Sequence, residues 1–306
     1  METISIITTF YNAEKYLIYA LNSIKKQILQ NINIEYILVN DCSTDNSLQI
    51  AQEFKESVQT ENITIKIVTP ENNLGCGGAR NYGIQQATGK YFMFLDADDY
   101  YINSDFVQRA YNDIVHYQAD IIEYGVIFNF GNGECHNMVT SGQQIITNPY
   151  EAVFYMFKDN RIKFNVWSKI YTREIVESFP YDTSREYEDI RTIPIWLKNI
   201  KKVVIQPTLE INYRSSNNSI IRDNGLKTRL GTISAMTEMA ELFKDNIAII
   251  KALYERAMID ICAVMENKTS LDEGFNEMSL LNTKLLSYIY PDTYQEKTYN
   301  IKQENE

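Results

Sequence analysis

Tyr91-Phe92-Met93-Phe94-Leu95-Asp96-Ala97-Asp98-Asp99 is the most informative stretch of this chain. Its first five residues are apolar or aromatic, which is typical of a buried strand. Three carboxylates follow within four positions, and unpaired carboxylates repel each other and are costly beside an apolar core. A divalent cation offsets that cost, because Mg2+ and Mn2+ prefer carboxylate oxygens. The Asp-x-Asp at the end of this strand therefore predicts a metal that holds phosphates.

The chain before this strand alternates strand and helix patterns. Strands are predicted near 3–7, 36–39 and 63–67, and helices after Asn12 as a cap, after the polar turn 41–47, and over 79–87 with Thr88-Gly89 as a stop signal. This order predicts an α/β fold with a mostly parallel central sheet and helices on both faces. Ligands of such sheets bind at the carboxyl ends of the strands. The polar segments 8–12, 40–45 and 96–99 are therefore expected to converge on one crevice.

The chain after this strand changes character twice. A helix is predicted after Asn103-Ser104 and a strand over 121–130, whereas 150–222 is mixed and rich in aromatic residues. From Leu226 to about Leu286 the pattern is mainly helical. We expect one domain over 1–222, made of two halves (1–115 and 116–222), and a helical C-terminal region over 223–306.

Composition excludes several classes of function. The 306 residues carry a net charge of −11, which argues against nucleic acid as a partner and gives no broad attraction to anionic lipid. The four cysteines are widely spaced, which favours reduced thiols in the cytoplasm. The chain has only two histidines, which argues against a zinc site or a Ser-His-Asp triad. The start of the chain shows no signal-peptide pattern, and no apolar run is long enough to span a bilayer. We expect a cytoplasmic protein with at most peripheral contact at the inner face of the membrane.

Four ordered stretches carry a family resemblance: Ile6 to Leu17 (IITTFYNAEKYL), Val39 to Asp45 (VNDCSTD), Asn73 to Asn81 (NLGCGGARN) and Phe94 to Asp99 (FLDADD). Together they resemble the family 2 glycosyltransferases, which have the GT-A fold. Thinner likeness continues through Trp167-Ser168-Lys169, Glu188-Asp189 and Tyr213-Arg214. The resemblance implies an inverting glycosyltransferase that uses a nucleotide-sugar donor, UDP-linked, with Mn2+ or Mg2+ as cofactor.

The resemblance places the nucleotide among residues of the first half. Tyr11 would form a flat wall for uracil, Asp41 would accept from its imide N–H, and Thr9 would lie beside them. An Asx cap in a turn is the alternative for Asp41. Arg80 would offer its charge to phosphate, with a structural pairing to Asp96 or Asp98 as its alternative. Two positions depart from the family pattern, with Asn40 and Cys42 where Asp and Gly are common.

The resemblance also assigns the acids. Asp98 would ligate the metal, Asp96 would be its partner on the nucleotide side, and Asp99 would cap the following segment. Asp189 would be the base that takes the proton of the attacking hydroxyl, which a single displacement requires. Glu188 would orient the sugar or a neighbour, and a solvated, acidic helix start is the alternative for this pair.

Four further candidates lie toward the acceptor and the diphosphate. Arg214 and Ser219 resemble a loop that closes on the pyrophosphate in some relatives, and an ordinary surface arginine is the alternative for Arg214. Trp167 and Lys169 match positions on the acceptor side, although Trp167 fits a core residue equally well.

The leading prediction is transfer of a sugar to a hydroxyl of a glycan or lipid-linked saccharide by metal-assisted single displacement. A non-catalytic nucleotide-sugar-binding subunit and a sugar nucleotidyltransferase are the alternatives. The latter class usually has a basic, glycine-rich first loop, which 8–12 lacks. The C-terminal helices are expected to pack on the core or to form a homodimer contact.

Overall fold

The computed structural model covers the whole chain and describes residues 1–58, 60–130, 134–183, 187–214, 226–266 and 283–289. The chain forms two compact units, one of residues 1–152 and 164–217 and the other of residues 153–163 and 218–306. The predicted boundary between 222 and 223 lies outside the described residues.

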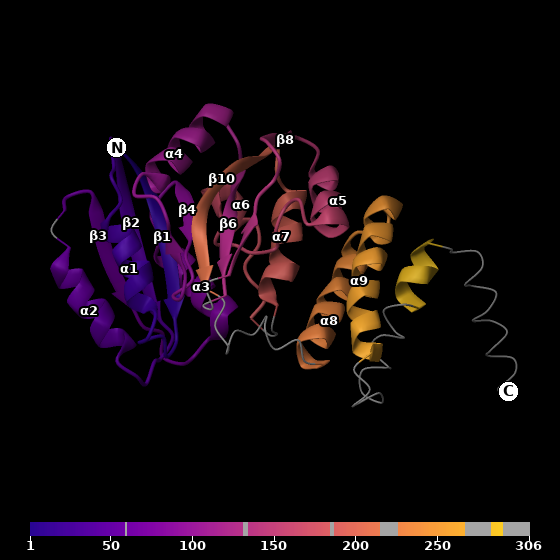
Figure 1. Cartoon of the computed structure of the whole chain (residues 1–306), viewed down its shortest axis with the longest axis horizontal. Coiled ribbons are helices and arrows are strands. Elements are labelled where there is room, and N and C mark those ends of the chain that lie inside the picture. The colour runs from indigo at the N-terminus through magenta and orange to yellow at the C-terminus, as the bar shows by residue number, and fades with distance from the viewer. Residues whose placement is uncertain (59, 131–133, 184–186, 215–225, 267–282, 290–306) are drawn as a thin grey trace, which may run out of the picture. The chain divides into compact units, whose positions relative to one another are not determined.

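The first unit is built on a sheet whose ten described strands follow the order β3-β2-β1-β4-β9-β6-β10-β5, with β7 beside β6 and β8 beside β10. The strands are β1 (Glu2–Phe10), β2 (Ile32–Asn40), β3 (Ile63–Val68), β4 (Tyr91–Phe94), β5 (Tyr100–Tyr101), β6 (Ile121–Asn129), β7 (Cys135–Met138), β8 (Gln144–Ile146), β9 (Lys169–Thr172) and β10 (Val203–Arg214). The long strands are rich in Ile, Val, Tyr and Phe, which suit a sheet covered on both faces. Figure 1 shows this sheet with its helices.

The helices of this unit cover the sheet on two faces. They are α1 (Leu17–Lys25), α2 (Ser47–Ser57), α3 (Gly75–Gln86), α4 (Phe106–Tyr117), the first part of α5 (Pro149–Asp159), α6 (Arg173–Glu177) and α7 (Glu188–Lys198). The strand order reverses after β3, where the chain returns past β2 and β1 to β4. Right-handed crossovers therefore put α3 on the face opposite α1 and α2. The reversal between β1 and β4 is the switch point at which such sheets bind ligands.

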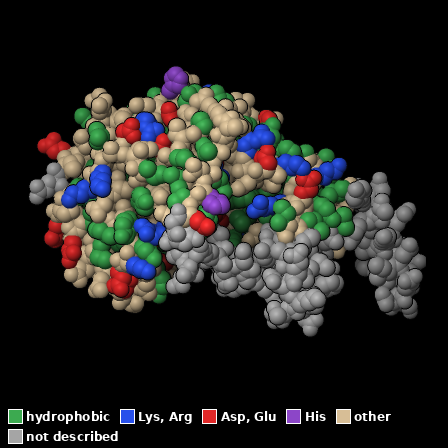
Figure 2. All heavy atoms as spheres, in the orientation of Figure 1, with side chains coloured by type: hydrophobic (Ala, Val, Ile, Leu, Met, Phe, Trp, Pro, Cys, Tyr) green, Lys and Arg blue, Asp and Glu red, His purple; other side chains and the backbone are tan. Residues whose placement is uncertain are grey.

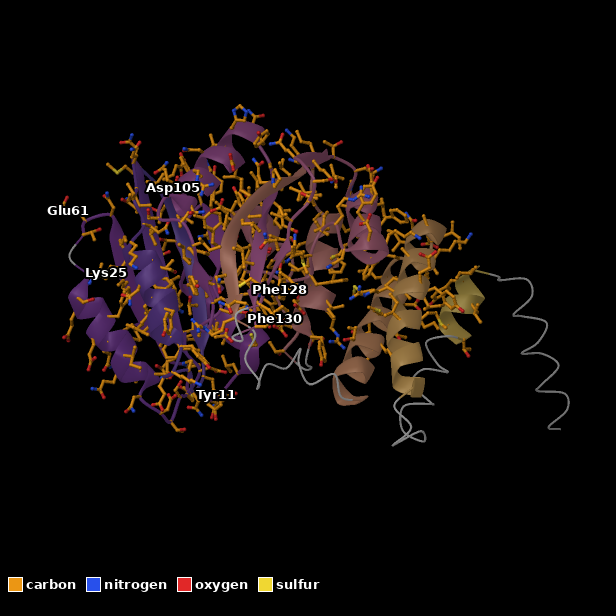
Figure 3. All side chains as sticks on the ribbon, viewed as in Figure 1. Tyr11, Lys25, Glu61, Asp105, Phe128 and Phe130 are labelled. Atoms are coloured by element: carbon orange, nitrogen blue, oxygen red, sulfur yellow. The ribbon has the colours of Figure 1, made fainter. Side chains whose placement is uncertain are left out.

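The main strands point the same way. β1 is parallel to β2 and β4, β2 is parallel to β3, and β10 is parallel to β6. β9 runs antiparallel to both β4 and β6, so β6 has the direction of β4. The carboxyl ends of β1, β2, β4 and β10 therefore lie along one edge. Tyr11, which follows β1, lies at this edge in Figure 3, and Asp105 lies toward the opposite end.

An aromatic cluster fixes α7 against the centre of the sheet. Phe94 lies 5.9 Å from Tyr171 and 6.4 Å from Trp196 between ring centroids, and Trp196 lies 5.3 Å from Tyr181. All four side chains are buried. Such a packed interior resists small displacements, so the end of β4 and the start of α7 are held in a defined relation.

Three local predictions are corrected by the structure. Asn12 does not cap a helix, because α1 begins at Leu17 and the Asn12 side chain accepts from the Thr44 backbone N–H at 2.8 Å. The helix predicted over 79–87 begins at Gly75, so the glycine-rich stretch is its first turn. Asp99 does not cap the following segment but accepts from the Arg214 backbone N–H.

The second unit is helical in its described part. It contains the rest of α5, α8 (Leu226–Leu242), α9 (Ile247–Glu266) and a helical turn over 283–289. Apolar side chains at helical spacing, among them Ile233, Met236 and Ala240 of α8, are buried. No helix within the described residues has both the length and the apolar character of a bilayer span.

Charged side chains are mixed on the visible surface of the first unit. Figure 2 shows acidic and basic side chains interspersed among polar and apolar ones. The face drawn therefore lacks the broad basic footprint that a nucleic-acid partner requires.

Candidate active site

The turn after β2 joins the turn after β1 and the start of α3. The Asp41 N–H donates to the Phe10 carbonyl, and Asn73 Nδ2 donates to the Asp41 carbonyl at 2.9 Å. Asp41 is buried, and its two carboxylate oxygens accept from the N–H groups of Leu74 at 2.7 Å and Gly75 at 2.9 Å. These bonds satisfy orphan donors at the start of the helix. Each oxygen keeps a further lone pair, so Asp41 can still accept from a base.

Tyr11 and Thr9 lie beside this turn. Tyr11 is 54% exposed, so a large part of its side chain is accessible to a ligand, and Thr9 is half-buried on β1 opposite Val39. Cys42 adopts a left-handed backbone with φ of +62°. Glycine adopts that conformation without the clash of a side chain, so Cys42 occupies a position whose backbone would suit the glycine of the family pattern.

The acidic run sits at the end of β4, where the Leu95 N–H still bonds the Ile7 carbonyl of β1. Asp96 and Asp98 are half-buried and Asp99 is buried. Burial, and then repulsion from Asp96, raise the pKa of Asp98 to about 6. Burial, with Asp98 and Asp96 as neighbours, also holds the pKa of Asp99 well above its usual range. Both shifts arise because the two carboxyls are desolvated and lie close to other acids.

A divalent cation fits this end of β4. The available ligands are hard carboxylate oxygens. A nearby positive charge would stabilise the ionised form of Asp98, which burial and Asp96 disfavour. Within the described residues, no group of three or more metal-binding side chains is assembled. Mg2+ and similar ions are commonly held by one or two carboxylates together with phosphate oxygens. Asp98, with Asp96 beside it, would hold the cation, and a bound diphosphate would complete its coordination.

Arg80 of α3 connects the acidic run to α7. Its Nη2 lies 3.0 Å from Oδ1 of Asp96, and its Nη1 lies 2.5 Å from Oε1 of Glu188. The Arg80 side chain is only 6% exposed. The alternative that the sequence left open, a pairing with Asp96, is therefore present in the structure, and Glu188 is a second partner that the sequence did not indicate.

Asp189 follows Glu188 in the first turn of α7 and is half-buried. Burial raises the pKa of Asp189 to about 7, with repulsion from Glu188 as the second cause and attraction to Arg80 opposing them. A general base works best when its pKa is near the operating pH. This carboxyl therefore has the property that a base at neutral pH requires.

Arg214 ends β10 beside the acidic run. Its Nε donates to the Asp98 carbonyl at 3.3 Å, and its guanidinium lies over the rings of Tyr19 at 4.4 Å and Tyr16 at 4.9 Å. Contacts of this kind hold an arginine in place while its charge stays near the site. Ser219, the other predicted residue of this segment, lies outside the described residues.

Trp167 and Lys169 are enclosed by protein. Trp167 is 6% exposed and stacks on Tyr213 with a centroid distance of 5.3 Å. Lys169 is fully buried, with its Nζ 2.6 Å from the Asn165 carbonyl and 3.1 Å from Oε2 of Glu123. Both side chains thus contact protein groups here rather than an open surface.

Several residues near the site were not indicated by the sequence. Asn81 binds both the N–H and the carbonyl of Tyr181, and Tyr16 and Tyr19 contact Arg214. Asn81 lies in the third of the four stretches that carry the resemblance but was given no role there, and its partner lies 100 residues away along the chain.

Comparison with known proteins agrees with this fold. The model of glycosyl transferase family 2 matches residues 5–179, and the chain belongs to this family. GlyA, a glycosyltransferase of Streptococcus pneumoniae, is 30% identical over 250 residues, which are 79% of this chain and 34% of GlyA. TarS, a poly(ribitol-phosphate) beta-N-acetylglucosaminyltransferase of Staphylococcus aureus, is 35% identical over 163 residues, 53% of this chain and 27% of TarS. The chain thus spans about a third or less of these two relatives.

Solved structures give the same fold. TarS residues 1–349 in complex with UDP-GlcNAc match with a TM-score of 0.70 and 20% identity, over 94% of this chain and 81% of that one. A mannosyltransferase of Pyrobaculum calidifontis in complex with GDP-Man and Mn2+ matches with a TM-score of 0.57 and 14% identity, over 97% and 83%. The predicted GT-A fold, a mixed α/β fold with a mostly parallel sheet, is confirmed.

Proposed function

We propose that this protein is an inverting glycosyltransferase that moves a sugar from a UDP-sugar to a hydroxyl of a glycan or lipid-linked saccharide. The observation that carries the proposal is the link through Arg80 between Asp96, at the end of β4, and Glu188, beside Asp189. It supports a donor diphosphate and a base on two sides of one crevice.

The donor is proposed to lie along the carboxyl edge of the sheet. Tyr11 would stack on the base, with Asp41 and Thr9 at its polar edge and Asp96 toward the ribose. The relative TarS, whose structure contains UDP-GlcNAc, supports a UDP-sugar, with UDP-GlcNAc as the first donor to test. The structure of the Pyrobaculum enzyme contains GDP-Man, so a guanine nucleotide sugar is the alternative donor to compare.

The transfer is proposed as a single displacement. The Asp189 carboxylate takes the proton from the acceptor hydroxyl as its oxygen bonds to the anomeric carbon. The bond between that carbon and the diphosphate oxygen breaks, and its electron pair leaves with UDP. A divalent cation, if held by Asp98 with Asp96 beside it, would supply positive charge to the diphosphate. Arg214 would add its fixed charge on the same side.

The test measures UDP release from UDP-GlcNAc, other UDP-sugars and GDP-mannose by the purified protein with Mn2+, with and without glycan acceptors. We expect metal-dependent release from at least one UDP-sugar. Absence of both binding and slow hydrolysis for every UDP-sugar would contradict the donor assignment. Binding without turnover would instead support the non-catalytic subunit.

Three further assignments stay predictions. They are the division at residue 222, the role of the C-terminal helices in core packing or a homodimer, and a cytoplasmic location with at most peripheral membrane contact. The dimer is tested by measuring the mass in solution of the full chain and of a chain that ends at Asn224. If both are monomers, the C-terminal helices do not form a dimer contact.

A further inference from the structure

Helix α3 contacts the chain around Tyr181 and the start of α7 through residues on two successive turns. Asn81 Nδ2 donates to the Tyr181 carbonyl at 2.9 Å, and Asn81 Oδ1 accepts from the Tyr181 N–H at 2.9 Å. Arg80 pairs with Glu188. The two residues therefore fix two points of the chain that leads to Asp189.

Gly77 allows these contacts. A Cβ at this position would lie 2.8 Å from the Asp182 carbonyl oxygen and 3.2 Å from Cγ of Glu188. Only a residue without a side chain fits at that spacing. The glycine therefore brings α3 close enough to α7 for the short contact between Arg80 and Glu188.

Arg80 is badly placed for a direct contact with phosphate. Its side chain is 6% exposed, its two terminal nitrogens face Asp96 and Glu188, and its guanidinium lies 5.6 Å from the centre of the Tyr181 ring. A phosphate would have to displace a carboxylate to reach it. The planar, forked guanidinium instead suits a bridge between two carboxylates.

We propose that Gly77, Arg80 and Asn81 form a bracket that positions Asp189, with Arg80 acting through Glu188 rather than as a ligand of the diphosphate. Asn81 and Arg80 are thus positioning residues. This inference rests on the proposed function, because it takes Asp189 as the base. It matters for rate because a displacement of about 1 Å of a reacting group can lower turnover about 100-fold.

The experiment compares Asn81→Ala and Arg80→Lys with Arg109→Lys. Asn81→Ala removes the two bonds to the Tyr181 backbone and changes none of the described contacts of Asp96 or of another proposed ligand-binding residue. Arg80→Lys keeps the charge but loses the fork. Arg109 pairs with Glu210 and Asp105 elsewhere in the first unit, so its replacement controls for the loss of an arginine ion pair. Three quantities are measured: the Kd of UDP with Mn2+, the kcat for UDP release, and hydrogen exchange of the α7 peptide 187–198.

We expect Asn81→Ala and Arg80→Lys to lower kcat by about 10- to 100-fold while the Kd of UDP changes less than about threefold. The α7 peptide should exchange faster in both variants, and Arg109→Lys should alter none of the three quantities. A loss of UDP affinity of about tenfold or more in Arg80→Lys, with kcat unchanged, would make Arg80 a phosphate ligand and overturn the bracket.

Failure of the bracket differs from failure of the proposed function. If the unaltered protein releases no UDP from any donor, the proposed function fails, and hydrogen exchange still tests the bracket. Unchanged exchange in both variants would overturn the bracket whatever the activity.

Discussion

The carboxylate of Asp99 accepts a hydrogen bond from the backbone N–H of Arg214, with Oδ1 and N 2.9 Å apart. This bond joins the acidic run after β4 to the last residue of β10, 115 positions later. The guanidinium of Arg214 and the carboxylate of Asp98 are thereby held beside the same turn. The proposed metal ligand, Asp98, and the proposed partner of the diphosphate, Arg214, thus lie at one edge of the sheet.

Replacement of Asp98 tests the metal assignment. We expect Asp98→Ala to abolish the Mn2+-dependent part of UDP binding, a loss above the roughly 10- to 100-fold typical of groups that only support a ligand. Calorimetry with and without Mn2+ measures it. Asp105→Ala is the control, because Asp105 lies away from Tyr11 (Figure 3) and pairs with Arg109. Equal Mn2+ dependence in Asp98→Ala and the unaltered protein would remove Asp98 as the ligand.

Replacement of Asp189 separates binding from transfer. Asp189→Asn keeps the shape of the side chain but cannot accept a proton, so UDP affinity should be kept while transfer falls by about 100- to 10,000-fold. Titration with UDP and assay of UDP release measure the two effects. Full activity of this variant would assign the base elsewhere.

The pH dependence of transfer follows from the raised pKa of Asp189. The base must be ionised to take a proton, so kcat/KM should rise with pH along a limb centred near 7, the pKa that burial and Glu188 give this carboxyl. Saturating Mn2+ keeps Asp98 ionised and removes its titration from the profile. A limb centred near 4, the usual range of a carboxyl, would contradict this assignment.

Two glycines of α3 should respond differently to the same added methyl group. In Gly83→Ala the new Cβ would lie 2.7 Å from Ile7 and 3.0 Å from Val39, so the free energy of unfolding should fall by about 1–3 kcal/mol. In Gly77→Ala the new Cβ would lie 2.8 Å from the Asp182 carbonyl oxygen and 3.2 Å from Cγ of Glu188, so stability should also fall, and kcat should fall by a larger factor than in Gly83→Ala. Thermal denaturation and UDP release on both variants measure this. The reverse order of effects would separate Gly77 from the site.

Lys169 offers a test of structure against ligand binding. Lys169→Met leaves the Glu123 carboxylate buried beside an apolar chain, which should destabilise the fold by about 3–5 kcal/mol. The double variant Glu123→Gln with Lys169→Met should recover part of that loss, as measured by chemical denaturation. A stable Lys169→Met protein with weakened acceptor binding would instead restore the role expected from the family resemblance.

The alternation of apolar strands and helices was enough to predict the mostly parallel sheet and which polar turns lie at the carboxyl ends of its strands. Boundaries were less well predicted. The helix α3 starts at Gly75 although glycine disfavours helices, because Asp41 accepts from the N–H groups at its first turn. That bond depends on a residue 34 positions earlier, which no local propensity contains.

The sequence by itself determined the class of protein and indicated the acids that we propose carry its chemistry, because strand periodicity and ordered local motifs are present along the chain. The tertiary structure alone decided how those residues pair. Hydrogen bonds join Arg80 to Glu188, Asn81 to Tyr181, and Asp99 to Arg214, each pair about 100 positions or more apart in the sequence. Such pairings depend on the twist of the sheet and the packing of the aromatic cluster. Burial there, rather than residue type, also sets the pKa of Asp98 and Asp189.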